Sequence, residues 1–121
     1  MFDLRKKTGN YGENLAVIFL KKKGYKIIET NFRTRFGEID IIAKKDDQII
    51  FVEVRTKTNI NFGAPEESIN RKKQEKLILM ANQYMSVKKL LHNNFRIDGI
   101  FIVIEQNNTE IRHLENIINI L

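Results

Sequence analysis

The first strong pattern along the chain is a run of six apolar residues at positions 15–20. Asn10, a favoured helix N-cap, precedes this run, and three lysines followed by Gly24 come after it. These flanking residues predict a helix over 10–23 that is largely buried, because its apolar residues cover most of its circumference. Glu13 stands three residues after Asn10, as the acidic partner of a capping box does.

Shorter apolar runs in the middle of the chain predict strands. Residues 25–33 give the first, and residues 37–57 have the pattern of a hairpin with two apolar strands about the charged turn of Asp46 and Asp47. Residues 58–65 are expected to form a loop that carries the only proline. Residues 95–104 predict a further strand, and the last eleven residues predict either a strand or a short tail.

A second helix is predicted between the hairpin and the strand at 95–104. It should begin near Asn70 and reach about Leu91, because five apolar residues recur at helical spacing: Leu77, Met80, Ala81, Tyr84 and Met85. The elements then follow the order α-β-β-β-α-β, with a last strand left open. This order predicts an α/β fold of one domain over residues 1–121, in which helices pack on a mixed sheet.

The predicted hairpin carries charged residues where apolar residues would bury more surface. A two-residue turn, or a four-residue loop around it, pairs Asp40 with Glu53 and Glu38 with Arg55. Side chains alternate between the faces of a strand, so these four residues should share one face of the hairpin. The opposite face would be an apolar core face formed by Ile39, Ile41, Ala43, Ile50, Val52 and Val54.

Two carboxylates placed opposite each other across a strand pair repel each other. A divalent cation bound by Asp40 and Glu53 would remove this repulsion, since Mg²⁺ takes carboxylate oxygens. The alternative is an ion-pair cluster in which Arg55 neutralises Glu38 and Glu53. Glu13 is a candidate third carboxylate, because its phase places it at the head of a helix face that should turn inward, and the capping box with Asn10 is its alternative role.

Composition narrows the class of protein. The formal net charge is +6 and the isoelectric point is about 9.6, which suits a polyanionic partner such as nucleic acid, although ordinary solubility gives the same balance. The sequence contains no cysteine, which excludes disulfides and thiolate ligands. No apolar run approaches the roughly 20 residues of a membrane span, and the first residues lack the apolar region of a signal peptide. A cytoplasmic protein without a membrane segment is therefore expected.

Several segments together resemble a known family. The residues GEID at 37–40, followed after a short hairpin by FVEV and a basic residue at 51–55, resemble the PD-(D/E)xK nuclease signature. With GENLAVIFLKKKGY, FGAPEESINRKKQEKLILMANQYM and FRIDGIFIV, the chain resembles the YraN-type family of endonuclease-like proteins over about residues 9–104. The resemblance implies a restriction-endonuclease-like core, with a mixed central β-sheet flanked by α-helices. It also implies a metal-dependent nuclease, or a nuclease-derived protein, that acts on branched or processed DNA.

The resemblance also implies roles for single residues. Asp40 matches the motif aspartate, Glu53 matches the second acidic residue, and Glu13 matches the helix carboxylate of Holliday-junction-resolvase-like members. Together these three would hold Mg²⁺ or Mn²⁺. Arg55 replaces the motif lysine and cannot act as a general base, because a guanidinium keeps its proton. Either its role is electrostatic, with Lys57 on the same face as the substitute lysine, or cleavage has been lost.

Other polar residues are candidates with weaker signals. The basic residues that could neutralise phosphates are Arg33, Arg35, Arg71, Lys72, Lys73 and Lys76, and the alternative for each is a solvated surface. Gln74 resembles the helix glutamine of RecB-like members. Asp98, beside Arg96, is interpreted as structural, and His113 is assigned no chemistry. Two other functions stay open: a non-catalytic nucleic-acid-binding module and an interaction adaptor on a nuclease scaffold. A homodimer is compatible with each.

Overall fold

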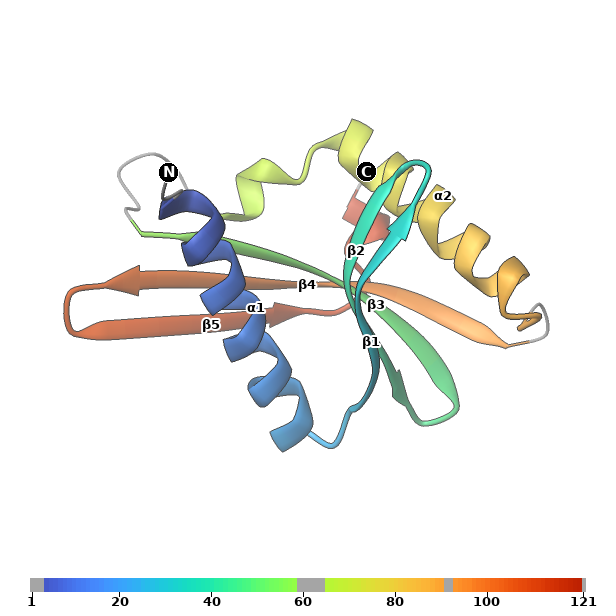
Figure 1. The fold of residues 1–121 in the computed structure, drawn as a ribbon, viewed down its shortest axis with the longest axis horizontal. Helices are drawn as coiled ribbons and strands as arrows, with labels where there is room; N and C mark the ends of the chain where they lie inside the picture. Colours follow the sequence, from blue (N-terminus) through green and yellow to red (C-terminus); the bar gives the residue numbers. More distant parts are fainter. Residues whose placement is uncertain (1–3, 59–64, 91–92, 121) are drawn as a thin grey trace.

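Two helices and five strands form most of the chain (Figure 1). The structure is a computed structural model, and it describes residues 4–58, 65–90 and 93–120. The elements are α1 (Leu4–Lys22), β1 (Lys26–Thr34), β2 (Gly37–Lys45), β3 (Gln48–Lys57), α2 (Arg71–Val87), β4 (Asn94–Glu105) and β5 (Asn108–Leu114). Short 3₁₀ helices, η2 (Pro65–Ser68) and η3 (Ile117–Ile120), precede α2 and follow β5. The predicted element order is confirmed, and the last strand that the sequence left open is β5.

The five strands form one sheet in the order β1-β2-β3-β4-β5. β3 and β4 are parallel, and the three other neighbouring pairs are antiparallel. α1 packs on one face of the sheet and α2 on the other, so each face has its own apolar core (Figure 1). The protein is therefore an α/β protein with a mixed central sheet, consistent with a restriction-endonuclease-like core.

α1 begins at Leu4, well before the predicted start at Asn10. Residues 5–8 contain no proline, and Thr8 and Gly9 lower the helix propensity only modestly, so nothing in this segment ends the helix. Asn10 is therefore inside the helix, and the predicted capping box with Glu13 is wrong. The predicted end is confirmed: Gly24 has a φ of +89°, and the amide of Tyr25 donates to the carbonyl of Leu20 at 3.0 Å.

α2 begins as predicted, because the side chain of Asn70 caps it by accepting a 2.9 Å hydrogen bond from the amide of Lys73. All five apolar residues that predicted this helix are buried. The helix ends at Val87, earlier than predicted, and Lys89 then takes a φ of +57°. Leu91, the predicted end, lies outside the described residues.

The hairpin of β2 and β3 turns through two residues, Asp46 and Asp47, whose φ angles of 50° and 62° are those of a type I′ turn. The predicted register holds from Lys45, which pairs with Gln48, as far as the pair of Ile41 and Val52. The ladder ends there, so the predicted pairs of Asp40 with Glu53 and of Glu38 with Arg55 are wrong. The Asp40 carboxylate replaces the next ladder bond, because its Oδ2 accepts a 2.8 Å hydrogen bond from the Val54 amide.

Both faces of the hairpin are core, which differs from the prediction of one apolar face. Ile41, Ala43, Ile50 and Val52 pack under α1 as predicted, with Val54 at the edge of that core. Ile39 packs under α2 instead, with Ile42, Ile49 and Phe51. A sheet that contains a parallel strand pair is normally covered on both faces, which explains why both faces of the hairpin are apolar.

Candidate functional site

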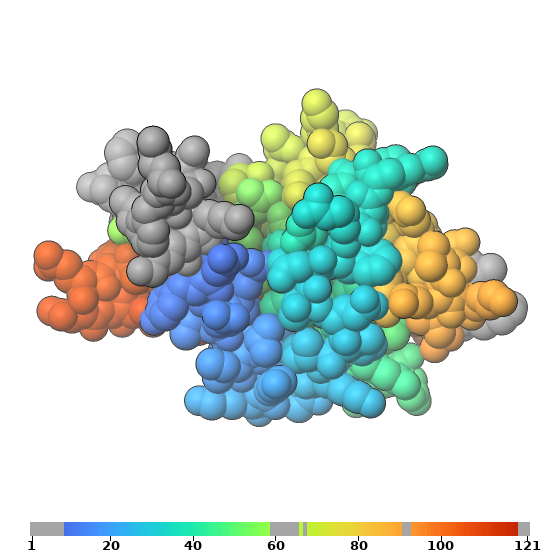
Figure 2. Space-filling view, viewed as in Figure 1, coloured from blue at the N-terminus to red at the C-terminus, as the bar shows by residue number. Residues whose placement is uncertain are grey.

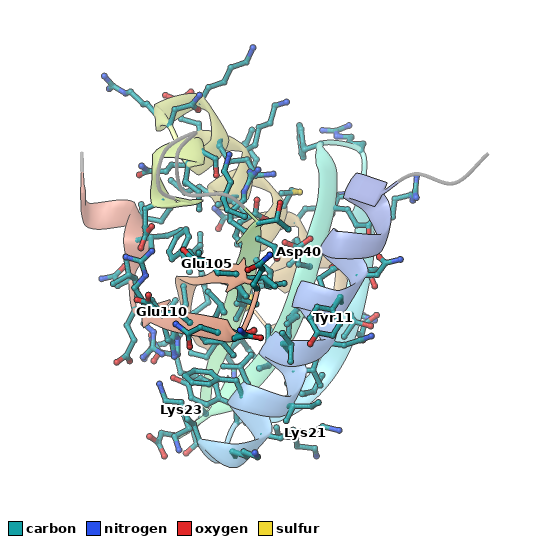
Figure 3. All side chains as sticks on the ribbon, turned by 90° about the vertical axis from the view of Figure 1, so that its left-hand side faces the viewer. Tyr11, Lys21, Lys23, Asp40, Glu105 and Glu110 are labelled. Carbon is teal, nitrogen blue, oxygen red and sulfur yellow. The ribbon has the colours of Figure 1, made fainter. Side chains whose placement is uncertain are left out.

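A cavity of about 400 Å³ opens where β2 and β3 separate beyond their last paired residues. Five elements contribute to it: α1, β1, β2, β3 and the first turn of α2. Its lining residues are Asn10, Glu13, Asn31, Glu38, Asp40, Glu53, Val54, Arg55 and Lys73. Figure 3 shows Asp40 on the sheet beside α1, the helix that carries Glu13. We refer to this space as the carboxylate cavity.

The Asp40 carboxyl has the most perturbed environment in this cavity. Burial and the neighbouring charge of Glu53 raise the pKa of Asp40 to about 9, although its hydrogen bond from the Val54 amide acts in the opposite direction. Burial also raises the pKa of Glu13, against the lowering effect of its hydrogen bond from Asn31. At neutral pH, Asp40 therefore holds a proton, so the two carboxyls of Asp40 and Glu53 are not both charged.

Two cations neutralise Glu53. Its Oε2 atom lies 2.7 Å from Nη2 of Arg55 and 3.3 Å from Nζ of Lys73, and the Glu53 side chain is only 4% exposed. The ion-pair cluster that the sequence left open as an alternative thus exists around Glu53. Its extension to Glu38 is wrong, because Arg55 turns to Glu53 and the Glu38 carboxylate lies 3.6 Å from Arg33.

The structure brings together Glu13, Asp40, Glu53 and Arg55, as predicted for one site, and adds Lys73 to them. Lys57, the predicted substitute lysine, lies further along β3 and is not part of the cavity lining. Lys73 was predicted only as one of six basic residues that could neutralise phosphates. Successive residues of a helix point in different directions. The first turn of α2 therefore places Lys73 at the cavity and leaves Arg71 and Lys72 outside its lining.

The remaining predicted residues surround the cavity or lie apart from it. Arg33 pairs with Glu38 at the rim, and the guanidinium of Arg35 lies 5.0 Å from the ring centroid of Phe36. Of the basic residues predicted to neutralise phosphates, those that are exposed and outside the lining are Arg33, Arg35, Arg71, Lys72 and Lys76. Gln74 is buried, and its Oε1 has no hydrogen-bond partner in the described part of the chain.

Asn31 is a site residue that the sequence analysis missed. It lies within β1 with a φ of +53°, a left-handed conformation that asparagine tolerates better than most residues. Its Nδ2 donates a 2.8 Å hydrogen bond to Oε1 of Glu13 and so joins β1 to α1 across the cavity. An asparagine inside a run of strand-forming residues was the available signal, because such a residue is unfavourable in a regular strand.

The donors in the cavity suit a hard divalent cation such as Mg²⁺ or Mn²⁺, because they are carboxylate oxygens. Within the described ranges, however, no three acidic or histidine side chains are already arranged as ligands of one ion. The reason is that Glu53 is occupied by two cations, Asp40 by a backbone amide and Glu13 by an asparagine. The residues fit a cation by their chemistry, and the cation would share Glu53 with its present partners, Arg55 and Lys73.

Close packing of α1 against β3 fixes the position of Glu13. A Cβ atom on Gly12 would overlap the Oγ1 atom of Thr56 and lie 3.1 Å from its Cβ. We expect Gly12→Ala to lower the free energy of unfolding by about 1–3 kcal/mol, although alanine favours a helix. Urea denaturation measures this change.

The matched control for that experiment is Gly9→Ala, on the same helix. No described atom lies within 4 Å of a Cβ built on Gly9, so this change should stabilise the protein by up to about 1 kcal/mol. Equal effects of the two substitutions would show that the contact of Gly12 with Thr56 does not limit the approach of α1 to the sheet.

None of the described helices is long and apolar enough to span a bilayer. The model of Uncharacterised protein family UPF0102 matches residues 12–102, which include every acidic residue of the carboxylate cavity. A UPF0102 protein of Clostridium acetobutylicum is 42% identical over 118 residues, covering 96% of this chain and 97% of its own length. A UPF0102 protein of Caldicellulosiruptor bescii is 47% identical over 115 residues, covering 92% and 96%. The chain belongs to the UPF0102 family.

Proposed function

We propose that the protein is a member of the PD-(D/E)xK nuclease superfamily that hydrolyses phosphodiester bonds in DNA with Mg²⁺ or Mn²⁺. The observation that carries this proposal is the carboxylate cavity itself. Four carboxyl groups from α1, β2 and β3 share one cavity with an arginine and a lysine. Such a mixture of acidic and basic groups can serve both a cation and a phosphate.

Asp40, Glu53 and Glu13 are the residues that would hold the cation. A bound cation supplies an activated water and neutralises charge on the phosphate. Asp40 must give up its proton for this purpose, since its raised pKa keeps the carboxyl neutral at pH 7. Asn31 keeps the Glu13 carboxylate turned toward the cavity through its hydrogen bond.

Arg55 is suited to bind the scissile phosphate. Its Nη2 contacts Glu53, while its buried Nε has no hydrogen-bond partner in the described part of the chain. A buried donor without a partner is unfavourable, so an additional acceptor at this position would stabilise it. A phosphate oxygen is such an acceptor, and a guanidinium can bind it through two N–H groups.

Lys73, rather than Lys57, is suited to be the lysine of the site. Its ammonium lies 3.3 Å from Glu53, and its side chain is 27% exposed, so it can contact both the carboxylate and an incoming phosphate. An ammonium can also donate a proton to a leaving group, which a guanidinium does not do. Arg55 and Lys73 would thus divide phosphate binding and proton donation.

We expect Lys73→Met to lower turnover of DNA cleavage by about 10²–10⁴-fold, with a smaller change in DNA affinity. The control is Lys72→Met, which removes an exposed lysine from the same turn of α2 but outside the cavity. It should change turnover by less than about threefold and weaken binding slightly. If both variants lost turnover equally, Lys73 would have no specific role in the cavity and would only attract DNA phosphates, as Lys72 does.

A cleavage assay on single-stranded, duplex, flapped and four-way DNA with Mg²⁺ or Mn²⁺ tests the proposal. The ion pairs around Glu53 favour a second candidate, a nucleic-acid-binding module in which the cluster is structural. Salt-dependent DNA binding without cleavage of any substrate would support this module. An absence of both binding and cleavage would leave the interaction adaptor as the better account.

A further inference from the structure

A second cavity of about 350 Å³ adjoins the carboxylate cavity. It lies between α1 and β1, which are close together on the face shown in Figure 2. Its lining residues are Asn10, Glu13, Asn14, Val17, Thr30 and Asn31. Three of them, Asn10, Glu13 and Asn31, also line the carboxylate cavity, so these residues form the boundary between the two spaces. We call the second space the amide cavity.

The linings of the two cavities differ in chemistry. The carboxylate cavity contains Arg55 and Lys73, whereas the single charged residue in the lining of the amide cavity is the acidic Glu13. An anion such as phosphate is therefore disfavoured in the amide cavity. Three asparagine side chains provide donors and acceptors together, and Val17 adds an apolar wall. This combination suits an uncharged planar group that carries both donors and acceptors.

We infer that the amide cavity binds the base of an unpaired nucleotide next to the scissile phosphate. The inference rests on the proposed function, since Arg55 and Lys73 would hold the phosphate and the neighbouring nucleoside would extend toward α1 and β1. Asparagine amides form hydrogen bonds with base edges. A paired base is stacked inside the duplex and cannot enter a cavity between a helix and a strand, so the base that enters must be unpaired. The substrate is therefore a single strand or a structure with an unpaired nucleotide at the cleavage position.

The side chain of Asn31 lies at the boundary between the two cavities. Asn31 has a φ of +53°, which is unfavourable for most residues other than glycine, and this backbone directs its side-chain amide to Glu13 at 2.8 Å. Asn31 lines both spaces, so its side chain contacts the third carboxylate and also lies beside the inferred base. A base in the amide cavity would then hold Asn31, and with it Glu13, in one position.

The experiment compares DNA binding by the wild type and two asparagine variants in EDTA, which prevents metal-dependent cleavage. Asn14→Ala removes an amide that lines the amide cavity but not the carboxylate cavity. Asn82→Ala is the matched control, because Asn82 is an exposed helical asparagine on α2. The probes are a short fluorescent single strand, the same strand with abasic sites in place of its bases, and the blunt duplex.

We expect the wild type to bind the single strand about tenfold or more tightly than the abasic strand or the duplex. Asn14→Ala should weaken single-strand binding by about five- to tenfold, as expected for one lost hydrogen-bonding side chain. The same variant should leave abasic-strand binding unchanged, and Asn82→Ala should leave all three affinities unchanged.

Equal affinity of the wild type for the base-bearing and abasic strands would overturn the inference, as would no measurable binding of either strand. An unchanged affinity of Asn14→Ala for the single strand would overturn it too. The proposed hydrolysis fails separately, in a cleavage assay with Mg²⁺. Duplex cleavage that is equal in wild type and Asn14→Ala would retain the nuclease and reject the amide cavity. Base-dependent binding without cleavage would retain the base-binding role of the amide cavity and reject the nuclease.

Discussion

Asp98→Ala is expected to lower the free energy of unfolding by about 3–5 kcal/mol, because it breaks a buried ion pair and removes the shared partner of Arg96, His113 and the Asn116 amide. Asp98 is 0% exposed on β4. Its Oδ1 accepts from Nε of Arg96 at 2.7 Å and from the amide of Asn116 at 2.9 Å, and its Oδ2 lies 2.8 Å from Nη2 of Arg96 and from Nε2 of His113. The carboxylate thus joins β4, β5 and the residue before η3.

The contribution of Asp98 should depend on pH. Burial by itself would raise the pKa of Asp98, but hydrogen bonds from His113, Arg96 and Asn116 lower it below the ordinary value of 3.8. A lowered pKa in the folded state stabilises the protein above the ordinary pKa, and this stabilisation is lost as the pH falls through the lowered value. Wild type and Asp98→Ala should therefore differ fully at pH 7 and less in strong acid.

Urea denaturation at several pH values measures both effects. Glu115→Ala is the control within the same network, since Oε1 of Glu115 lies 2.9 Å from Nη1 of Arg96 but its side chain is 58% exposed. An exposed ion pair contributes at most about 1 kcal/mol, so this variant should unfold close to the wild type. If Asp98→Ala unfolded at the same urea concentration as Glu115→Ala, the buried network would not be a main source of stability.

Asp40→Asn is expected to stabilise the protein in the absence of a divalent cation while lowering cleavage on the order of a thousandfold. The pKa of Asp40 is raised to about 9, so the folded protein retains a proton that the unfolded chain releases near pH 3.8. Stability of the wild type therefore falls as the pH rises between these values. Asparagine is neutral and keeps an oxygen to accept the Val54 amide, so the gain at pH 8 should be on the order of 2 kcal/mol.

Addition of Mg²⁺ or Mn²⁺ should reverse the order of stability. A ligand at 100 times its dissociation constant stabilises the native state by about 2.7 kcal/mol, and this increment should be absent in Asp40→Asn. The control is Asp47→Asn, in the β2–β3 turn. Asp47 is exposed, and its backbone has a φ of 62° that asparagine also adopts. A cation-dependent shift that is equal in both variants would show that the ion acts elsewhere.

Local chemistry explains which parts of the fold could be predicted from the sequence. Gly24, Asn70 and the turn at Asp46 and Asp47 act within a few residues of themselves, and each marks the element boundary that was expected. The start of α1 was missed because Asn10 has the residue type of a cap without being at a boundary. Residue type is a weak guide where the preceding residues also favour a helix.

The candidate site, too, could be predicted only for residues that are close to one another in the sequence. Asp40 and Glu53 belong to one hairpin, so counting along its strands placed them together even though their ladder ends one pair earlier. Lys73 and Asn31 reach the cavity from α2 and β1, and no local pattern relates either residue to the hairpin. Their contacts with Glu53 and Glu13 exist only after the helices have packed on the sheet.

The parallel pairing of β3 with β4 has a consequence for the order of folding. β1, β2 and β3 are joined by tight turns, whereas β4 can pair with β3 only after a long crossover that includes α2 has closed. Closing a long loop costs more chain entropy than closing a turn, and distant contacts slow folding. The three strands β1, β2 and β3 therefore bring Asp40 near Glu53 first. Lys73 reaches Glu53 only when the crossover that contains α2 has closed. Until then Arg55, on the same strand, can neutralise Glu53, and Lys73 then becomes its second cation.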